Sequence, residues 1–274
     1  MVTHAMKTPK EIEPGSEREK DFWWHSSDND IREFLSESLD INETFLQNIR
    51  PAFDISKERS VSCVDGRTPE GALHLAGSGI LLAEEHDEEI ALATLRTMKL
   101  SAIYSHENCG AAALVAKLRG EDPHDGDRLG KAWAEYAAEA LGIRYGGHLP
   151  VEPKRLHPER AIYIDGTGIF NISATSLRIP GFFVSHRYHQ SPINAMREVG
   201  LGITIALSDR GFGPRFTPDS PFILLIIGHP TEDRFSSTTI RKEVETLLNT
   251  DEIAKANRNR LTIRTFTPPT EWMK

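Results

Sequence analysis

The strongest chemical signal in this sequence comes from its two cysteines and one of its histidines. Cys63 stands in the segment Cys-Val-Asp-Gly-Arg, and His106 and Cys109 stand in His-Glu-Asn-Cys-Gly. Two thiolates and one imidazole suit Zn²⁺, and three protein ligands leave one tetrahedral position open, as in catalytic zinc sites. The alternative is two ordinary buried cysteines beside a hydrogen-bonded loop histidine. We predict a zinc site, because in a reducing compartment a lone pair of cysteines more often binds metal than forms a disulfide.

The elements around these residues are expected to bring them together. Residues 60–64 have the β-prone pattern of a buried strand that ends at the following Asp-Gly pair, and residues 100–104 predict a second strand. A helix is expected between them at 87–98, and another begins at or just after Cys109. Parallel strands need such a long connection, so this order predicts a mainly parallel sheet. Both motifs then lie at carboxyl ends of strands, where the ligand sites of open α/β sheets form.

The rest of the chain continues the α/β pattern, and hydrophobic periodicity places its elements. The expected helices cover about 28–49, 133–141, 191–200 and 237–248, and the expected strands cover 161–164, 203–207, 222–227 and 261–266. Residues 1–20 are polar and are expected to be mobile. Trp23 and Trp24 are expected to anchor this N-terminal arm, on the core in preference to a second subunit. Residues 162–168 and 224–230 faintly echo the two cysteine motifs, which leaves a degenerate duplication as a minor alternative.

The sequence resembles the β-class carbonic anhydrases. That family has two signatures, Cys-x-Asp-x-Arg and His-x-x-Cys-Gly, and the matching residues are Cys63, Asp65, Arg67, His106, Cys109 and Gly110. The segment HLAGSGILL at 74–82 is similar to the Ala-Gly loop of the family, and the resemblance covers 58–118, with a weaker part to about 172. It implies an α/β fold with a mainly parallel central sheet and flanking helices. The single domain would comprise an N-terminal helical arm at 1–57, a zinc core at 58–172 and a C-terminal extension at 173–274 that continues the α/β fold.

The resemblance also implies an activity. In that family, zinc-bound water loses a proton, and the hydroxide attacks carbon dioxide to give bicarbonate in a reversible reaction. Zinc makes this possible because it lowers the pKa of bound water to about 7. Asp65 would accept a hydrogen bond from the hydroxide, and Arg67 would hold Asp65 ionised and oriented. In some members this aspartate instead takes the fourth zinc position, and the plain alternative is a salt bridge without a catalytic part.

The sequence also departs from the family pattern. Gly66 stands where the family usually has serine, and the segment between Arg67 and the Ala-Gly loop is short. The strand that lines the substrate pocket is therefore expected to be trimmed. We find no counterpart of the glutamine and aromatic pair that often contacts substrate across the dimer. The other histidines are candidates for a proton shuttle or an extra ligand, and His74 and His86 are closest in sequence to the site, but surface or hydrogen-bonded positions are expected for most of them.

Composition limits the partners. The net charge of −8 is spread along the chain and forms no basic face, so nucleic acid is not an expected partner. The N-terminal residues lack the apolar core of a secretory signal, and the longest apolar run, Phe222 to Ile227, is too short to span a membrane. A cytoplasmic protein without membrane contact is expected. The resemblance implies a homodimer or a higher homo-oligomer that acts on the small molecules carbon dioxide and bicarbonate.

Two other functions fit the same residues. One is a hydrolase of carbonyl sulfide or carbon disulfide, in which the same metal chemistry acts on a different substrate. The other is a non-catalytic, zinc-stabilised binding or regulatory protein, which the trimmed pocket segment and the long extensions favour. Sulfide release would identify the first. Unfolding on loss of a zinc ligand, together with tolerance of a change at Asp65, would identify the second.

Overall fold

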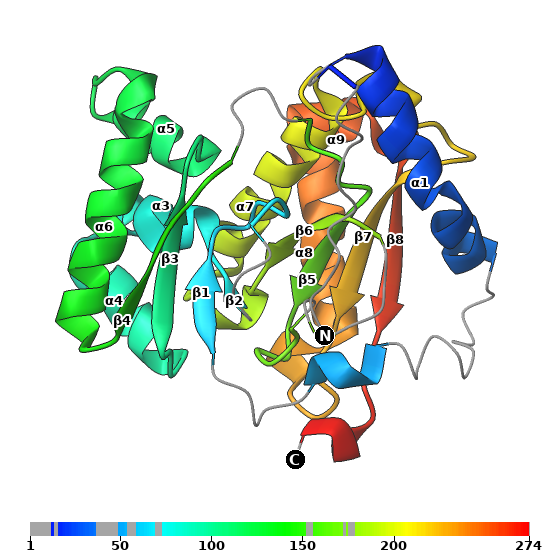
Figure 1. The fold of residues 1–274 in the computed structure, drawn as a ribbon. Helices are drawn as coiled ribbons and strands as arrows, with labels where there is room; N and C mark the ends of the chain where they lie inside the picture. Colours follow the sequence, from blue (N-terminus) through cyan, green and yellow to red (C-terminus); the bar gives the residue numbers. More distant parts are fainter. Residues whose placement is uncertain are drawn as a thin grey trace.

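The computed structural model describes residues 12–13, 16–36, 49–53, 59–68, 73–151, 156–171, 174 and 179–273. Its strands form two four-stranded sheets in which all strand pairs are parallel (Figure 1). The first sheet has the order β2-β1-β3-β4, and its strands are β1 Ser60–Ser62, β2 Leu73–His74, β3 Ala102–His106 and β4 Arg144–Leu149. The second has the order β6-β5-β7-β8, and its strands are β5 Ala161–Asp165, β6 Gly181–Val184, β7 Phe222–Ile227 and β8 Leu261–Phe266. The parallel α/β class is confirmed, with the strands divided between two sheets.

Helices cover both sheets (Figure 1). The helices of the first half are α3 Ile80–Glu85, α4 Glu88–Thr97, α5 Gly110–Leu118 and α6 Gly126–Leu141. Those of the second half are α7 Pro192–Leu207, α8 Ser237–Thr250 and α9 Glu252–Ala256, and the N-terminal helix is α1 Glu17–Ser36. Within this described part of the chain, no helix combines the length and the apolar character needed to cross a membrane.

Most helix boundaries follow from local capping. The side chain of Asp87 accepts a hydrogen bond from the Ile90 amide and so starts α4, and Ser191 caps α7 in the same way. One sequence prediction is wrong: residues 203–207 form the last turns of α7 and not a strand. Gly200 does not end the helix, because Val199, Ile203 and Ala206 continue one apolar face that is fully buried.

The second sheet is apolar on both faces because both are covered. Alternate side chains of β7 point to opposite faces. Leu224 and Ile226 belong to the core that also contains the apolar residues of α7 and α8, whereas Leu225 and Ile227 pack in a second cluster with Phe53 and residues of α1 and the C-terminus. A strand buried on both faces must be hydrophobic throughout, which explains the unbroken apolar run that the sequence shows here.

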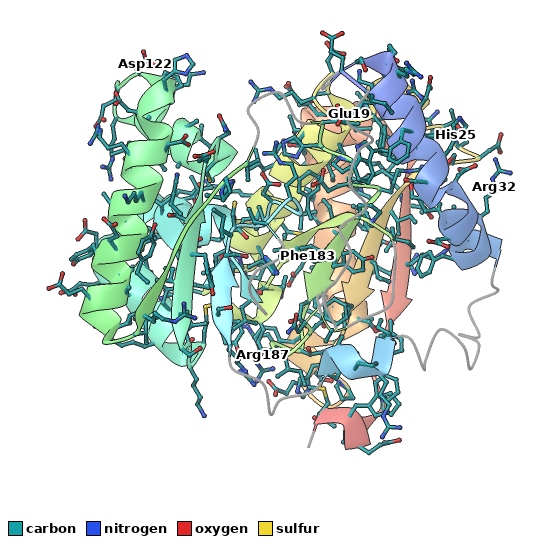
Figure 2. The ribbon with its side chains drawn as sticks, in the orientation of Figure 1. Glu19, His25, Arg32, Asp122, Phe183 and Arg187 are labelled. Atoms are coloured by element: carbon teal, nitrogen blue, oxygen red, sulfur yellow. The ribbon has the colours of Figure 1, made fainter. Side chains whose placement is uncertain are left out.

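The two sheets meet at β2 and β6. The Ser185 amide donates to the carbonyl of His74, and the Phe183 amide donates to the carbonyl of Val64. Phe183, labelled in Figure 2, lies between the two halves and packs against His74 with 4.9 Å between ring centroids. In each sheet the second strand along the chain lies beside the first, followed by the third and the fourth. This repeated order supports the minor alternative of a degenerate duplication.

The N-terminal arm packs on the core of the same chain. Helix α1 begins at Glu17, within the segment that the sequence led us to expect as mobile, and residues 37–48 of the expected helix at 28–49 lie outside the described residues. Trp23 is buried, and the Trp24 ring stacks over the guanidinium of Arg160 with 3.4 Å between Cζ and the ring centroid. The expected anchoring by these tryptophans is therefore confirmed, and the anchor is on the core.

Candidate metal centre

The structure brings the three predicted ligands together. Cys63 follows directly after β1, His106 is the last residue of β3, and Cys109 is the N-cap of α5. One ligand atom from each of these residues lies within 4.8 Å of the other two, and all three residues are buried. Both motifs are at carboxyl ends of parallel strands, as predicted, because β1 and β3 are neighbours in register.

The spacing of the two sulfurs fits a zinc ion. The Sγ atoms of Cys63 and Cys109 are 3.8 Å apart. Zinc–sulfur bonds of about 2.3 Å at a tetrahedral angle place two thiolates about 3.8 Å apart. A disulfide would require a sulfur–sulfur distance of about 2.05 Å, and both cysteines are free. The donor set and its spacing therefore fit a tetrahedral metal site.

The imidazole of His106 is oriented as a metal ligand. Its Nδ1 lies 2.8 Å from the backbone carbonyl oxygen of Glu107, which can only accept a hydrogen bond, so Nδ1 carries the proton. The Nε2 atom is then the one with a lone pair, and it is buried and has no hydrogen-bond partner among the residues that the structure describes. A second hydrogen bond that fixes the tautomer is typical of metal-binding histidines. The unpartnered Nε2 is the expected coordinating atom.

Backbone amides support the two sulfurs. The Gly77 amide donates to Sγ of Cys63 at 3.2 Å. Gly77 has φ of +56°, and a Cβ there would lie 2.5 Å from the side chain of Ile80, so glycine is required for this approach. Cys109 lies at the start of α5, where the amides of Ala111 and Ala112 face its sulfur. The Ala-Gly loop thus has a local task, which is to bring an N–H group to the metal site.

The charges in this centre favour a bound cation. The hydrogen bond from Cys63 lowers the pKa of the Cys109 thiol, against the effect of burial, so Cys109 is the more acidic thiol of the pair. Burial alone would lower the pKa of His106, but its interactions with Cys63 and the charge of Asp65 outweigh burial and raise that pKa to about 9. A positive charge is therefore stabilised at the point where a zinc ion would replace the proton.

Asp65 and Arg67 form a buried, bidentate ion pair beside the ligands. The Arg67 Nε–H donates to Oδ1 of Asp65 at 2.9 Å, and its terminal NH₂ donates to Oδ2 at 2.6 Å. Burial opposes ionisation of Asp65, but the hydrogen bonds and the charge of Arg67 hold its pKa well below the usual range. Asp65 does not join the three ligands in the group of donor atoms within 4.8 Å. Its carboxylate is thus held by Arg67.

The second half of the chain closes one side of this site. A Cβ on Gly66 would lie 2.1 Å from the carbonyl oxygen of Gly181, the first residue of β6, and 3.1 Å from Oε1 of Glu159. Any side chain at this position would meet the backbone of Gly181, so the close approach of the two halves requires glycine here. The trimmed segment after Arg67 contains only the two-residue strand β2 in its described part.

Two residues near Asp65 were missed by sequence reasoning. His157 Nδ1 lies 4.0 Å from Oδ1 of Asp65 and 3.3 Å from Oε2 of Glu159. Both residues precede β5 and match no motif, so the only available signal was a pair of charged side chains directly before a buried strand. The two histidines proposed from the sequence lie elsewhere: His74 Nδ1 contacts the carbonyl oxygen of Cys63 at 2.8 Å, and His86 is exposed beside Asn194.

Comparisons with family models, curated proteins and solved structures gave no match. The fold and the donor set therefore define a class only: a parallel α/β protein with a buried Cys-His-Cys centre able to hold a metal ion.

Proposed function

We propose that this protein is a zinc enzyme that hydrates carbon dioxide reversibly to bicarbonate, in the manner of the β-class carbonic anhydrases. The observation that carries this proposal is the combination of a three-ligand centre with an ionised carboxylate fixed beside it. Cys63, His106 and Cys109 would hold the metal, and Asp65 with Arg67 supplies an oriented acceptor next to it. A purely structural zinc site would normally have four protein ligands.

A bound zinc ion would supply the acidification of a water molecule, which makes hydroxide available near neutral pH. The protein supplies orientation and charge. Arg67 donates to both oxygens of Asp65 through its guanidinium and also to Oδ1 through its backbone amide, so the acceptor position left for a reacting O–H group is on Oδ2. Because Asp65 stays ionised, it accepts this hydrogen bond without competing for the proton. Burial of the ligands strengthens these interactions by excluding bulk water.

The direct test is metal analysis followed by stopped-flow kinetics. Reduced protein reconstituted with zinc is expected to contain one zinc per chain and to accelerate hydration of carbon dioxide above the buffer rate between pH 7 and 9. Asp65→Asn is expected to retain zinc and to lose about 100-fold or more in rate, since an oriented polar contact at the reacting atoms is worth about 10²–10³. Asp219→Asn, at an exposed position, is the matched control and should change nothing.

Three results would refute or redirect the proposal. Metal-free protein under reducing conditions would remove its basis. Zinc-loaded protein without hydration activity would favour the non-catalytic alternative, particularly if Asp65→Asn leaves the free energy of unfolding unchanged while Cys63→Ala unfolds the chain. Release of sulfide from carbonyl sulfide or carbon disulfide, with no hydration of carbon dioxide, would assign the hydrolase function to the same residues.

A further inference from the structure

A group of four charged or titratable side chains lies beside the metal ligands, and the second half of the chain supplies two of them. Asp65 and Arg67 come from the loop after β1, while His157 and Glu159 come from the segment that leads into β5. All four are buried or nearly so, with side-chain exposures of 8%, 5%, 9% and 1%. The group therefore joins the two halves of the molecule at the site.

Glu159 is the unusual member of this group. Among the described residues, neither of its carboxylate oxygens has a hydrogen-bond partner, and Nδ1 of His157 lies 3.3 Å from Oε2. A buried carboxylate without donors is costly unless a positive charge lies beside it. Nδ1 of His157 is buried, faces both carboxylates and likewise has no hydrogen bond within the described part of the chain. An imidazolium at His157 would satisfy Glu159 electrostatically.

A metal ion is the other way to neutralise this group, because Asp65, His157 and Glu159 have donor atoms within 4.8 Å of one another. The ion pair of Arg67 argues against it. The guanidinium binds both oxygens of Asp65 and would repel a divalent cation held by the same carboxylate. Two carboxylates and one guanidinium leave one negative charge, which a single proton on His157 balances.

The hydration reaction releases one proton for each bicarbonate formed, and that proton must leave the buried site. Asp65 is already paired with Arg67, whose guanidinium donates to both of its carboxylate oxygens, so the proton needs a further acceptor. The next basic atom from Asp65 is Nδ1 of His157, at 4.0 Å from Oδ1. One water molecule, or a small rotation of the imidazole ring, spans this distance.

We propose that His157 accepts the proton that leaves the metal site and that Glu159 is the positioning residue that stabilises the resulting imidazolium. This inference rests on the proposed function. Water gives its proton to Nδ1 of His157, the remaining hydroxide supplies the electron pair that bonds to the carbon of carbon dioxide, and a buffer base in the solvent then takes the proton from the ring. No oxidant or reductant takes part, and the neutral imidazole is restored in each cycle.

The position of the ring suits this transfer. The backbone amide of His157 donates to the carbonyl of Arg210 at 2.8 Å, and the imidazole ring packs on Phe182 with 5.8 Å between ring centroids. Nδ1 of His157 is buried and faces the two carboxylates, while 9% of the side chain is exposed to solvent. An imidazole that lies beside the reacting groups and keeps some solvent exposure is suited to carry a proton.

Exchange of ¹⁸O between labelled carbon dioxide and water separates the two steps of the reaction. It measures the interconversion of carbon dioxide and bicarbonate independently of the release of labelled water, which requires a proton. With zinc-loaded protein, His157→Ala is expected to slow the release of labelled water about tenfold or more, to keep the interconversion within about twofold, and to regain release when imidazole is added. Glu159→Gln should lower release by a smaller factor, and His86→Ala, at an exposed histidine, should match the unchanged protein.

The outcomes separate the two proposals. No exchange above background in the unchanged, zinc-loaded protein would overturn both. If the unchanged protein shows exchange, three results would overturn only the role of His157. These are release of labelled water that is unaltered in His157→Ala, a loss of release and interconversion by the same factor in His157→Ala, and a loss of release in His86→Ala but not in His157→Ala. Two measurements of the bound metal test, independently of activity, whether His157 holds a metal ion. The visible spectrum of cobalt-substituted His157→Ala should match that of the unchanged protein, and metal analysis should find one ion per chain, since a second ion lost in His157→Ala would make the group a cation site.

Discussion

Gly66 provides a direct test of how closely the two halves are packed at the site. A Cβ at this position would lie 2.1 Å from the carbonyl oxygen of Gly181 and 3.1 Å from Oε1 of Glu159. Ordinary contact between a carbon and an oxygen begins above 3 Å, so about 1 Å must be gained by moving backbone. Gly181 cannot yield easily, because it is paired with Ala161 of β5 and the ring of Tyr163 lies only 2.4 Å from where a Cβ of Gly181 would be.

The expected cost of Gly66→Ala follows from this geometry. Overpacking in a core usually costs about 1–3 kcal/mol, and here the clash is with backbone, so we expect about 3 kcal/mol. For a chain of this size that corresponds to a fall in Tm of about 6–12 °C. Zinc affinity should fall as well. Gly66 belongs to the loop that carries Cys63, Asp65 and Arg67, so moving Gly66 away from the second half would also move these residues.

The assay is thermal and urea unfolding of the zinc-loaded protein, with Gly200→Ala as the control. Gly200 lies in α7, where an added Cβ would make only an ordinary contact of 3.6 Å with Leu247, so this variant should be neutral or slightly more stable. A fall in Tm of less than about 2 °C for Gly66→Ala would refute the reasoning, because it would mean that the two halves do not hold each other at this distance.

Two further predictions concern buried cations. Arg67→Gln leaves the Asp65 carboxylate buried without its partner and should destabilise the protein at pH 7 by about 3–5 kcal/mol. The depressed pKa of Asp65 stabilises the folded state fully above about pH 4, and this effect is lost as the pH falls below that value toward the folded pKa, so urea unfolding should find that the deficit of the variant narrows only below about pH 4. A deficit that stays constant below about pH 4 would contradict this assignment. Trp24→Ala removes the ring that covers the buried Arg160 guanidinium, whose Nε has no hydrogen-bond partner in the described part of the chain, and should cost about 3–5 kcal/mol by the same measurement. Trp24→Phe keeps an aromatic face and should cost less than half as much, so equal losses would argue against the cation–π contact.

The metal ligands could be predicted from the sequence because residue type and spacing within a short segment are enough to recognise them. His106 and Cys109 are separated by one turn at the end of β3, and Cys63 follows the neighbouring parallel strand, so the order of the elements was sufficient to bring them together. The bidentate pairing of Asp65 with Arg67 is local in the same sense, since only Gly66 separates them in the sequence. The strand expected at 203–207 failed because β-branched residues near glycines resemble a strand, and only packing against the sheet shows that they continue α7.

The sequence by itself determined the donor set, the class of elements around it and the hydrophobic runs that form the strands. Only the tertiary structure decided that the strands divide into two sheets and that the second half meets the site through Gly181, His157 and Glu159. The physical reason is the distance along the chain over which each interaction acts. Periodicity and capping act within a few residues, but the position of a side chain about 90 residues away depends on how the two halves pack against each other, and no local pattern encodes that contact.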